Sequence, residues 1–209
     1  IEGWRKTGAF SLSDLIIRDP SATAEGFPGA LVNPPLEALS AAKVVLLAVK
    51  PQIWREAVKD VAPHLAPDAI IVSIAAGVRA ADISQAFDGR RVARVMPTTA
   101  VAIGQGAASL YADTAEALEA AKALLAPVAA TVELADEHLM HAATAVSGSA
   151  PAYLYAFIEA LEAAGAGQGL APEDSARLAR ATIAGAAALL AQGGEEPAEL
   201  RKQVTSPGG

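Results

Sequence analysis

Short apolar runs alternate with segments of helical spacing along residues 1–135. The apolar runs are bounded by Gly, Pro, Asp or Ser, as strands are. They lie at 15–17, 44–49, 69–74, 92–96 and 130–134. The segments between them predict helices at 35–42, 52–62, 80–87 and 114–125, the last with Asp113 as its cap, while residues 1–8 resemble the end of a helix closed by Gly8. This alternation predicts β-α-β units and a mostly parallel sheet.

The strand pattern disappears after residue 135, which we take as a domain boundary. Helices are predicted at 136–145, 152–165, 172–192 and 197–204. The second is apolar nearly all round, with Glu159 and Glu162 as its only charges, and such a helix is expected to be buried. Ser147 or Ser149 is expected to cap it and, with small neighbours, to form an anion seat at its start.

Composition narrows the possible partners. Net charge is −7 without a basic run, which disfavours nucleic acid and anionic membranes, and no apolar run reaches membrane-spanning length. The chain has no cysteine, which excludes disulfide and thiolate chemistry and suits a cytoplasmic location. It starts at Ile1 and stops in a Ser-Pro-Gly-Gly turn, so we interpret it as a fragment of a longer protein.

Candidate chemistry gathers where the predicted strands end. Ligands of an open parallel sheet bind at the carboxyl ends of its strands, and small residues or prolines there let a flat ligand approach the backbone. The ends are Arg18, Asp19, Pro20; Ala48, Val49, Lys50, Pro51; Ala75, Ala76, Gly77; and Pro97, Thr98, Thr99. Any one of them could be an ordinary turn, but together they favour a dinucleotide site. Arg18 suits the 2′-phosphate of NADPH, while the neighbouring Asp19 keeps NADH open.

Two other motifs carry little weight. Glu137, His138 and His141 form E-H-x-x-H rather than the zinc-binding H-E-x-x-H, so no metal site is expected. The run around Ser147 is not G-x-S-x-G and has no evident His partner, so no serine nucleophile is expected.

The chain resembles the pyrroline-5-carboxylate reductase family along nearly its whole length. The matching motifs are LLAVKPQ at 46–52, SIAAGV at 73–78, RVMPTTAVAIGQGA at 94–107, AVSGSAPAYLYAFIEALEAAG at 145–165 and VTSPGG at 204–209. The resemblance implies a Rossmann-like dinucleotide-binding domain over 1–135 and an all-helical dimerisation and substrate domain over 136–209, with both outer ends truncated. It also implies hydride transfer from NADPH to the C=N carbon of 1-pyrroline-5-carboxylate, the last step of proline biosynthesis.

The resemblance also implies site residues. The loops at 48–51 and 75–77 would line NADPH, with Arg18 and Pro20 near its adenosine end. The substrate would be bound by Val204, Thr205, Ser206, Pro207, Gly208 and Gly209. The family's Gly-rich phosphate loop, and the Thr after its final Gly-Gly, would lie outside the chain, so no catalytic residue is assigned within it and the fragment is expected to be inactive alone. Thr98, Thr99 and Ala100 replace the family's Asn-Thr-Pro, and Ala150 replaces a Gly.

Two other functions and an assembly remain to be considered. A related imine or hydroxyacid reductase would need a catalytic Lys in the helical domain, where Lys202 is the only one. A dinucleotide-binding module without catalysis is the other alternative.

The excess of apolar helix surface predicts a homodimer through the helical domain. Small residues that would let helices approach closely are Ala163, Ala164, Gly165, Gly185, Ala186 and Ala187.

Overall fold

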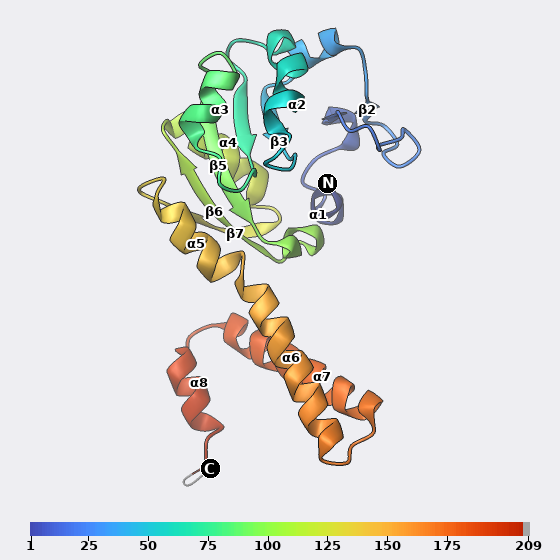
Figure 1. The fold of residues 1–209 in the computed structure, drawn as a ribbon, viewed down its shortest axis with the longest axis vertical. Coiled ribbons are helices and arrows are strands. Elements are labelled where there is room, and N and C mark those ends of the chain that lie inside the picture. The colour runs from blue at the N-terminus through green and yellow to red at the C-terminus, as the bar shows by residue number, and fades with distance from the viewer. Residues whose placement is uncertain (207–209) are drawn as a thin grey trace. The chain divides into compact units, whose positions relative to one another are not determined.

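A computed structural model describes residues 1–206 and contains two compact units (Figure 1). The first is Ile1–Ser149 and the second begins at Ala150. The first unit extends beyond residue 135 because helix α5 (Leu139–Ser147) packs on strands of its sheet. The functional boundary at 135 therefore stays a prediction, distinct from this division by contacts.

A five-stranded sheet forms the centre of the first unit, in the order β3-β4-β5-β6-β7. Neighbouring strands are parallel except β5 and β6, so the prediction of a mostly parallel sheet is confirmed. The predicted strands appear within a few residues of their expected bounds. They are β3 (Val44–Leu47), β4 (Ile70–Ser73), β5 (Val92–Pro97) and β7 (Ala129–Glu133). Strand β6 (Gly106–Ala112) was not predicted, because Gly and Ala dominate it and both are poor strand formers.

A separate two-stranded parallel sheet pairs β1 (Ile16–Ile17) with β2 (Leu31–Val32), the second of which was not predicted. The strand predicted at 15–17 is present as Ile16–Ile17, but the expectation that it is buried was wrong. Ile16 and Ile17 are only half-buried, since β1 is hydrogen-bonded to β2 alone and does not join the larger sheet.

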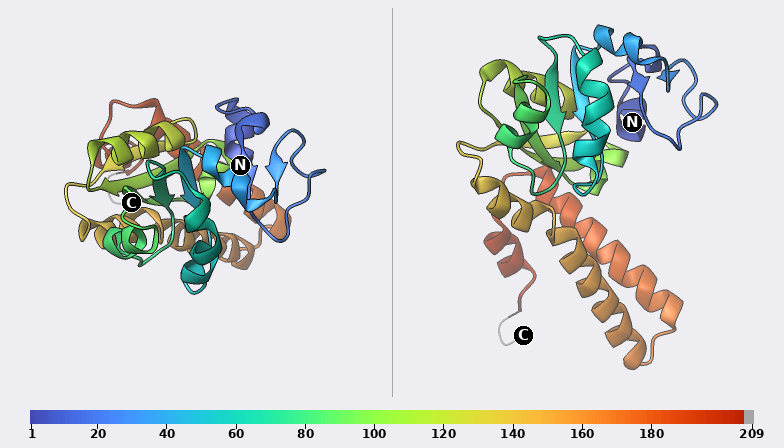
Figure 2. Two further views of the ribbon diagram at one scale, coloured as in Figure 1. Left: turned by 90° about the horizontal axis from the view of Figure 1, so that it is seen from above. Right: turned by 45° about the horizontal axis from the view of Figure 1, so that its top comes forward.

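Helices cover both faces of the larger sheet (Figures 1 and 2). Ile71 contacts the core cluster under α2 (Trp54–Val61) and α3 (Ala80–Ala86), whereas Val72 contacts the cluster under α4 (Ala115–Leu125). This alternation is the period of two that a strand covered on both faces requires. The remaining helical elements are α1 (Glu2–Thr7), η1 (Leu12–Asp14), η2 (Leu36–Ala41), η3 (Ala62–His64) and η4 (Thr99–Ile103).

The residues at the helix ends agree with the predicted caps in one case and differ in two others. Gly8 closes α1 in the left-handed conformation, at φ 67°, as predicted. The cap of α4 is Thr114, whose hydroxyl accepts from the backbone N–H of Ala117, and not Asp113. The expected cap at Ser147 is also wrong, because this residue lies inside α5 and its hydroxyl donates to the Ala143 carbonyl at 2.9 Å. Among the described residues, no helix N–H is seen donating to the Ser149 hydroxyl.

The second unit consists of α6 (Ala150–Gly167), α7 (Pro172–Gln192) and α8 (Pro197–Gln203). Helices α6 and α7 lie side by side as a hairpin (Figure 2). Within this chain α6 has no buried residue, so the expectation that it is buried is wrong for the single chain. No helix within residues 1–206 has the length and apolar character needed to cross a membrane.

Candidate functional site

The carboxyl ends of β3 and β4 lie beside each other because Leu47 pairs with Ser73 in the strand register. The loops that leave these ends, 48–51 and 74–79, therefore start from adjacent positions on one edge of the sheet. Ala48, Lys50, Ala76 and Gly77 are all exposed there. The register thus places two of the predicted cofactor-binding stretches together, although their role stays a prediction.

The 74–79 loop presents backbone rather than side chains. Ala75 is buried, and its N–H donates to the Ser73 hydroxyl at 3.2 Å. Ala76 and Gly77 then point outward, and Gly77 has φ 74°, which L side chains rarely adopt. A Cβ at Gly77 would have open space around it, so the need for glycine here is conformational and the backbone is accessible to a ligand.

Glu137 closes this loop from a distant part of the chain. Its Oε1 accepts from the Ala80 N–H at 2.6 Å, the first residue of α3, and from Arg94 Nη1 at 2.9 Å. The side chain of Arg94 is 8% exposed and that of Glu137 is 24% exposed. Sequence reasoning missed both residues. It treated Glu137 only as part of a false zinc motif, and no local signal links it to Arg94.

The two other residues of the E-H-x-x-H motif do not join Glu137. His138 pairs with Asp136, with its Nδ1 2.6 Å from the carboxylate, and its backbone N–H donates to the same oxygen at 3.0 Å. Both hydrogen bonds from His138 lower the pKa of Asp136, and the backbone bond has the larger effect. No group of three His, Asp or Glu side chains within residues 1–206 is arranged to hold a metal ion.

Arg18, Asp19 and Pro20 follow β1 and are all exposed. The Arg18 guanidinium donates to the Pro34 carbonyl at 3.0 Å through Nη1. Because strand pairing does not connect β1 to β3, register does not place this loop beside the other two. Ile16 does pack against the core cluster that contains Leu47, so both belong to one body.

Asn33, at the end of β2, holds the Arg18 loop in shape. Its Oδ1 accepts from the Asp19 N–H at 3.1 Å, and its Nδ2 donates to the Asp19 carbonyl at 2.8 Å. The Asp19 carboxylate accepts from the Ser21 hydroxyl at 2.6 Å and the Ser21 N–H at 2.8 Å, which lowers the pKa of Asp19. Asn33 has φ 47°, a left-handed conformation that Asn tolerates. Its role was another that the sequence did not reveal.

The predicted substrate-binding residues lie at the end of the chain. Val204, Thr205 and Ser206 are exposed, and the Thr205 hydroxyl donates to the Arg201 carbonyl at 2.7 Å. Pro207, Gly208 and Gly209 lie outside the described residues.

Thr98, which replaces the family's Asn, contacts β6. Its hydroxyl accepts from the Ala107 N–H at 3.0 Å, and its own N–H donates to the Ala107 carbonyl at 2.9 Å. Ala150, which replaces a Gly, is the first residue of α6.

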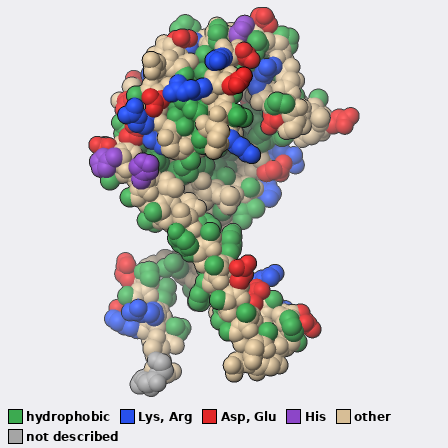
Figure 3. All heavy atoms as spheres, in the orientation of Figure 1, with side chains coloured by type: hydrophobic (Ala, Val, Ile, Leu, Met, Phe, Trp, Pro, Cys, Tyr) green, Lys and Arg blue, Asp and Glu red, His purple; other side chains and the backbone are tan. Residues whose placement is uncertain are grey.

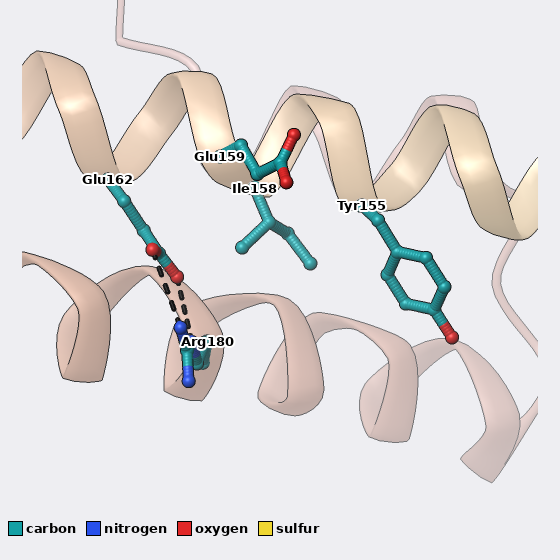
Figure 4. Close-up of a pocket in the computed structure, with 5 residues that line it drawn as sticks. All are labelled: Tyr155, Ile158, Glu159, Glu162 and Arg180. Carbon is teal, nitrogen blue, oxygen red and sulfur yellow. Dashed lines mark hydrogen bonds and ion pairs between the residues drawn. The ribbon is translucent and has the colours of Figure 1, made fainter.

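A shallow recess lies between α6 and α7 (Figure 4). Its floor is apolar, and at one end Glu162 accepts from Arg180 Nε at 2.7 Å. This bond raises the pKa of Arg180. The recess is lined by Tyr155, Ile158, Glu159, Glu162 and Arg180. Its two carboxylates, Glu159 and Glu162, belong to no group of three side chains within residues 1–206 that could hold a metal ion, and Glu162 is paired with Arg180, so we interpret the recess as packing surface rather than as a catalytic site.

Comparison with known proteins finds a match for each of the two parts of the chain. Residues 137–209 match the family model described as pyrroline-5-carboxylate reductase dimerisation, and 18–77 match the model described as NADP oxidoreductase, coenzyme F420-dependent. The pyrroline-5-carboxylate reductase of Pseudomonas aeruginosa is 44% identical over 178 residues, which are 83% of this chain and 65% of that protein. The chain is therefore similar to pyrroline-5-carboxylate reductases over most of its length.

Other members of the family are similar over a comparable span. The Arabidopsis thaliana pyrroline-5-carboxylate reductase is 37% identical, over 83% of this chain and 63% of that protein. Pyrroline-5-carboxylate reductase 2 of Bacillus subtilis is 39% identical, over 79% of this chain and 60% of that protein. The chain thus spans less than two thirds of the length of these relatives.

Solved structures confirm the predicted fold class. The Coxiella burnetii pyrroline-5-carboxylate reductase matches with a TM-score of 0.86 and 26% identity, covering 100% of this chain and 83% of that one. The Plasmodium falciparum pyrroline carboxylate reductase, solved with NADP bound, matches with a TM-score of 0.83 and 24% identity, covering 100% and 79%. A Rossmann-like domain followed by a helical region is therefore the fold of this family and of this chain.

Proposed function

We propose that the protein of which this chain is part reduces 1-pyrroline-5-carboxylate to L-proline with NADPH. The observation that carries the proposal is the 44% identity to a pyrroline-5-carboxylate reductase over 83% of the chain. The two-part fold supports it, because that fold pairs a dinucleotide-binding sheet with a helical substrate and dimerisation region. The proposed domains are 1–135 and 136–209.

The residues at the strand ends fit a dinucleotide. Ala48, Ala76 and Gly77 leave the backbone accessible at the edge where ligands of a parallel sheet bind. When bound, the nicotinamide supplies a hydride to the C=N carbon of the substrate. The chain itself supplies orientation at these two loops. The proposed substrate contacts at 204–209 would bind the carboxylate through backbone N–H groups.

The alternatives gain no support. A reductase of the hydroxyacid type would use a lysine of the helical domain, but Lys202 pairs with Glu199 at 2.6 Å on α8. A module without catalysis is separated from an enzyme by assay of the full-length protein. Oxidation of NADPH that depends on 1-pyrroline-5-carboxylate and forms proline supports the proposal. NADPH binding without turnover would favour the module instead.

We further propose that NADPH is preferred to NADH. Arg18 uses one N–H on the Pro34 carbonyl, and its exposed guanidinium is suited to a 2′-phosphate. The Asp19 carboxylate, which would bind the ribose hydroxyl of NADH, accepts both bonds from Ser21 on its Oδ1. The proposed preference for NADPH therefore rests on Arg18.

Exchanging Arg18→Ala in the full-length protein tests this preference. One charge-assisted contact is worth about 1.5–3 kcal/mol, so the KM for NADPH should rise about ten- to a hundred-fold, while that for NADH changes little. Arg91→Ala is the matched control, since Arg91 also donates to a backbone carbonyl, that of Asp68, but at the opposite end of the strands. Equal effects of Arg18→Ala on both cofactors would refute the assignment.

The proposed partner is a second copy of the chain, bound through the helical unit. Large apolar side chains stand exposed on α6 and α7, as the apolar surface in Figure 3 shows. Tyr153 is 70% exposed and Leu189 is 62% exposed. Leaving so much apolar surface in water is unfavourable, which favours an obligate interface of about 2,000 Å² or more.

The cytoplasm is the proposed location.

Light scattering at low micromolar concentration measures the mass. We expect a dimer or a larger assembly, and a charge introduced by Ala186→Glu should split it or unfold the helical unit. A monomeric mass for the full-length protein would exclude this interface.

A further inference from the structure

We propose that Glu137 is a positioning residue for the nicotinamide cofactor. Its carboxylate fixes the far end of the 74–79 loop, so that the exposed backbone of Ala76 and Gly77 is held ready for the ligand. The inference rests on the proposed function, because it assigns the 74–79 loop to cofactor binding. It adds to that function the side chain of Glu137, which lies 57 residues along the sequence from Ala80, the residue to which it is hydrogen-bonded.

The loop has an anchor at each end and little between them. At its start the Ala75 N–H donates to the Ser73 hydroxyl at 3.2 Å. At its end the Ala80 N–H donates to Glu137 Oε1 at 2.6 Å. The one backbone bond within the loop, from Val78 to Ala75, is long at 3.4 Å. Packing holds the flanks of the loop, since Ala75 is buried and Val78 contacts a core cluster, but the exposed backbone of Ala76 and Gly77 has no hydrogen bond of its own within residues 1–206 and lies between the two anchors.

Glu137 takes the place of a helix cap that α3 lacks. Arg79 precedes α3 and cannot cap it, because a guanidinium has no acceptor for the helix N–H groups; it pairs with Asp82 at 3.3 Å instead. A carboxylate that accepts from the first N–H groups of a helix is favourable both as a hydrogen bond and towards the helix dipole. The start of α3 is thus held by a residue from the segment between β7 and α5.

Arg94 explains why Glu137 lies at this position. Ala93 and Val95 face the α4 side of the sheet, so the strand period places Arg94 on the α3 side. Its side chain is almost fully buried, and Arg94 pairs with Ser73 in the strand register. A buried guanidinium needs a counter-charge, and Glu137 provides it. One carboxylate oxygen therefore connects strand β5 with the start of α3, where the loop ends.

The test separates positioning from folding by changing the ion pair in two ways. Glu137→Gln keeps an oxygen that accepts from Ala80 but removes the charge. The double variant Glu137→Ala with Arg94→Met removes that acceptor without leaving a buried cation unpaired. Glu133→Ala is the matched control, because Glu133 also pairs with a cation, Lys122 at 2.6 Å, but lies on β7 away from the loop.

The measurements are KM for NADPH, KM for 1-pyrroline-5-carboxylate, kcat and NADPH binding by fluorescence, all on the full-length protein. For the double variant we expect the KM and Kd for NADPH to rise about tenfold or more, the change expected from one charge-assisted bond. The KM for 1-pyrroline-5-carboxylate should stay within about threefold, which is well below the effect of one such bond. Glu137→Gln should retain most NADPH affinity, and Glu133→Ala all of it.

The outcomes distinguish this inference from the proposed function. A double variant that folds and binds NADPH as the wild type does would refute the positioning role. A proportional loss of all parameters in both Glu137 variants would refute it as well, because that result indicates a purely structural residue. If the wild type binds NADPH but does not reduce 1-pyrroline-5-carboxylate, the proposed reaction fails, while the binding measurements still decide the role of Glu137.

Discussion

Helices α6 and α7 lie close together at Gly165, and we therefore predict that Gly165→Ala destabilises the protein. A Cβ at Gly165 would lie 2.2 Å from Ser175 Oγ and 3.2 Å from Ser175 Cβ. Ser175 is buried on α7, and its hydroxyl donates to the Glu162 carbonyl at 2.7 Å. The added methyl group must therefore displace this hydroxyl and push α6 and α7 slightly apart.

The expected magnitude follows from opposing terms. Alanine is favoured over glycine inside a helix by about 1 kcal/mol. Loss of the Ser175 hydrogen bond costs about 0.5–1.5 kcal/mol. Overpacking against the Ser175 side chain costs about 1–3 kcal/mol. The free energy of unfolding should thus fall by about 0.5–3.5 kcal/mol, because steric displacement outweighs the gain in helix propensity.

Gly167→Ala provides the control for this substitution. Gly167 also lies in α6, as its last residue, but a Cβ there meets nothing within 4 Å. We expect this change to stabilise the chain by up to about 1 kcal/mol, through helix propensity alone. Urea unfolding followed by circular dichroism, at one protein concentration for all variants, measures both effects.

A double variant decides whether the clash is the cause. Ser175→Ala removes the oxygen at 2.2 Å and leaves the contacts with Ser175 Cβ at 3.2 Å and Leu170 Cδ1 at 3.4 Å. Combined with Gly165→Ala, it should cost less than the sum of the single changes, with a coupling of about 0.5–3 kcal/mol. If Gly165→Ala proved as stabilising as Gly167→Ala, or if the two changes were simply additive, the reasoning from close approach would be refuted.

Three further outcomes are expected in the first unit. Thr114→Ala should lower stability by about 0.5–2 kcal/mol in urea unfolding, through loss of the α4 cap, and no loss would show that the cap is unimportant. The hydrogen bond to Asp113, with desolvation, raises the pKa of Tyr111 to about 12, so the folded state favours the neutral phenol. The resulting stabilisation is present below about pH 10 and is lost as the pH rises towards about 12. Ultraviolet titration of the folded protein should show Tyr111 ionising at about pH 12, and Asp113→Asn should lower the pH at which it ionises. Gly3→Ala should detach α1 from η4, because a Cβ would lie 1.9 Å from the Val101 carbonyl oxygen; unchanged hydrogen exchange in residues 2–7 would contradict this.

Local patterns in the sequence determined most of the elements. Pro172 and a long run of good helix formers predicted α7 with its observed bounds, because a helix start and its continuation depend on residues within one turn. The buried strands were also predicted, since an apolar run between turn residues has few alternatives. Strand β6 was missed because small residues carry little strand signal, so its pairing with β5 is what makes it a strand.

Contacts between distant residues were decided only by the tertiary structure. Glu137 bonds to Ala80, and Asn33 to Asp19, because folding brings separate strand ends together. Nothing within one helical turn or one strand period encodes such a pair. For α6 the sequence determined that an apolar surface must be covered, but the structure shows that this chain leaves it exposed. Hydrophobicity is a local property of the chain, whereas burial depends on which other surfaces the folded molecule brings against it.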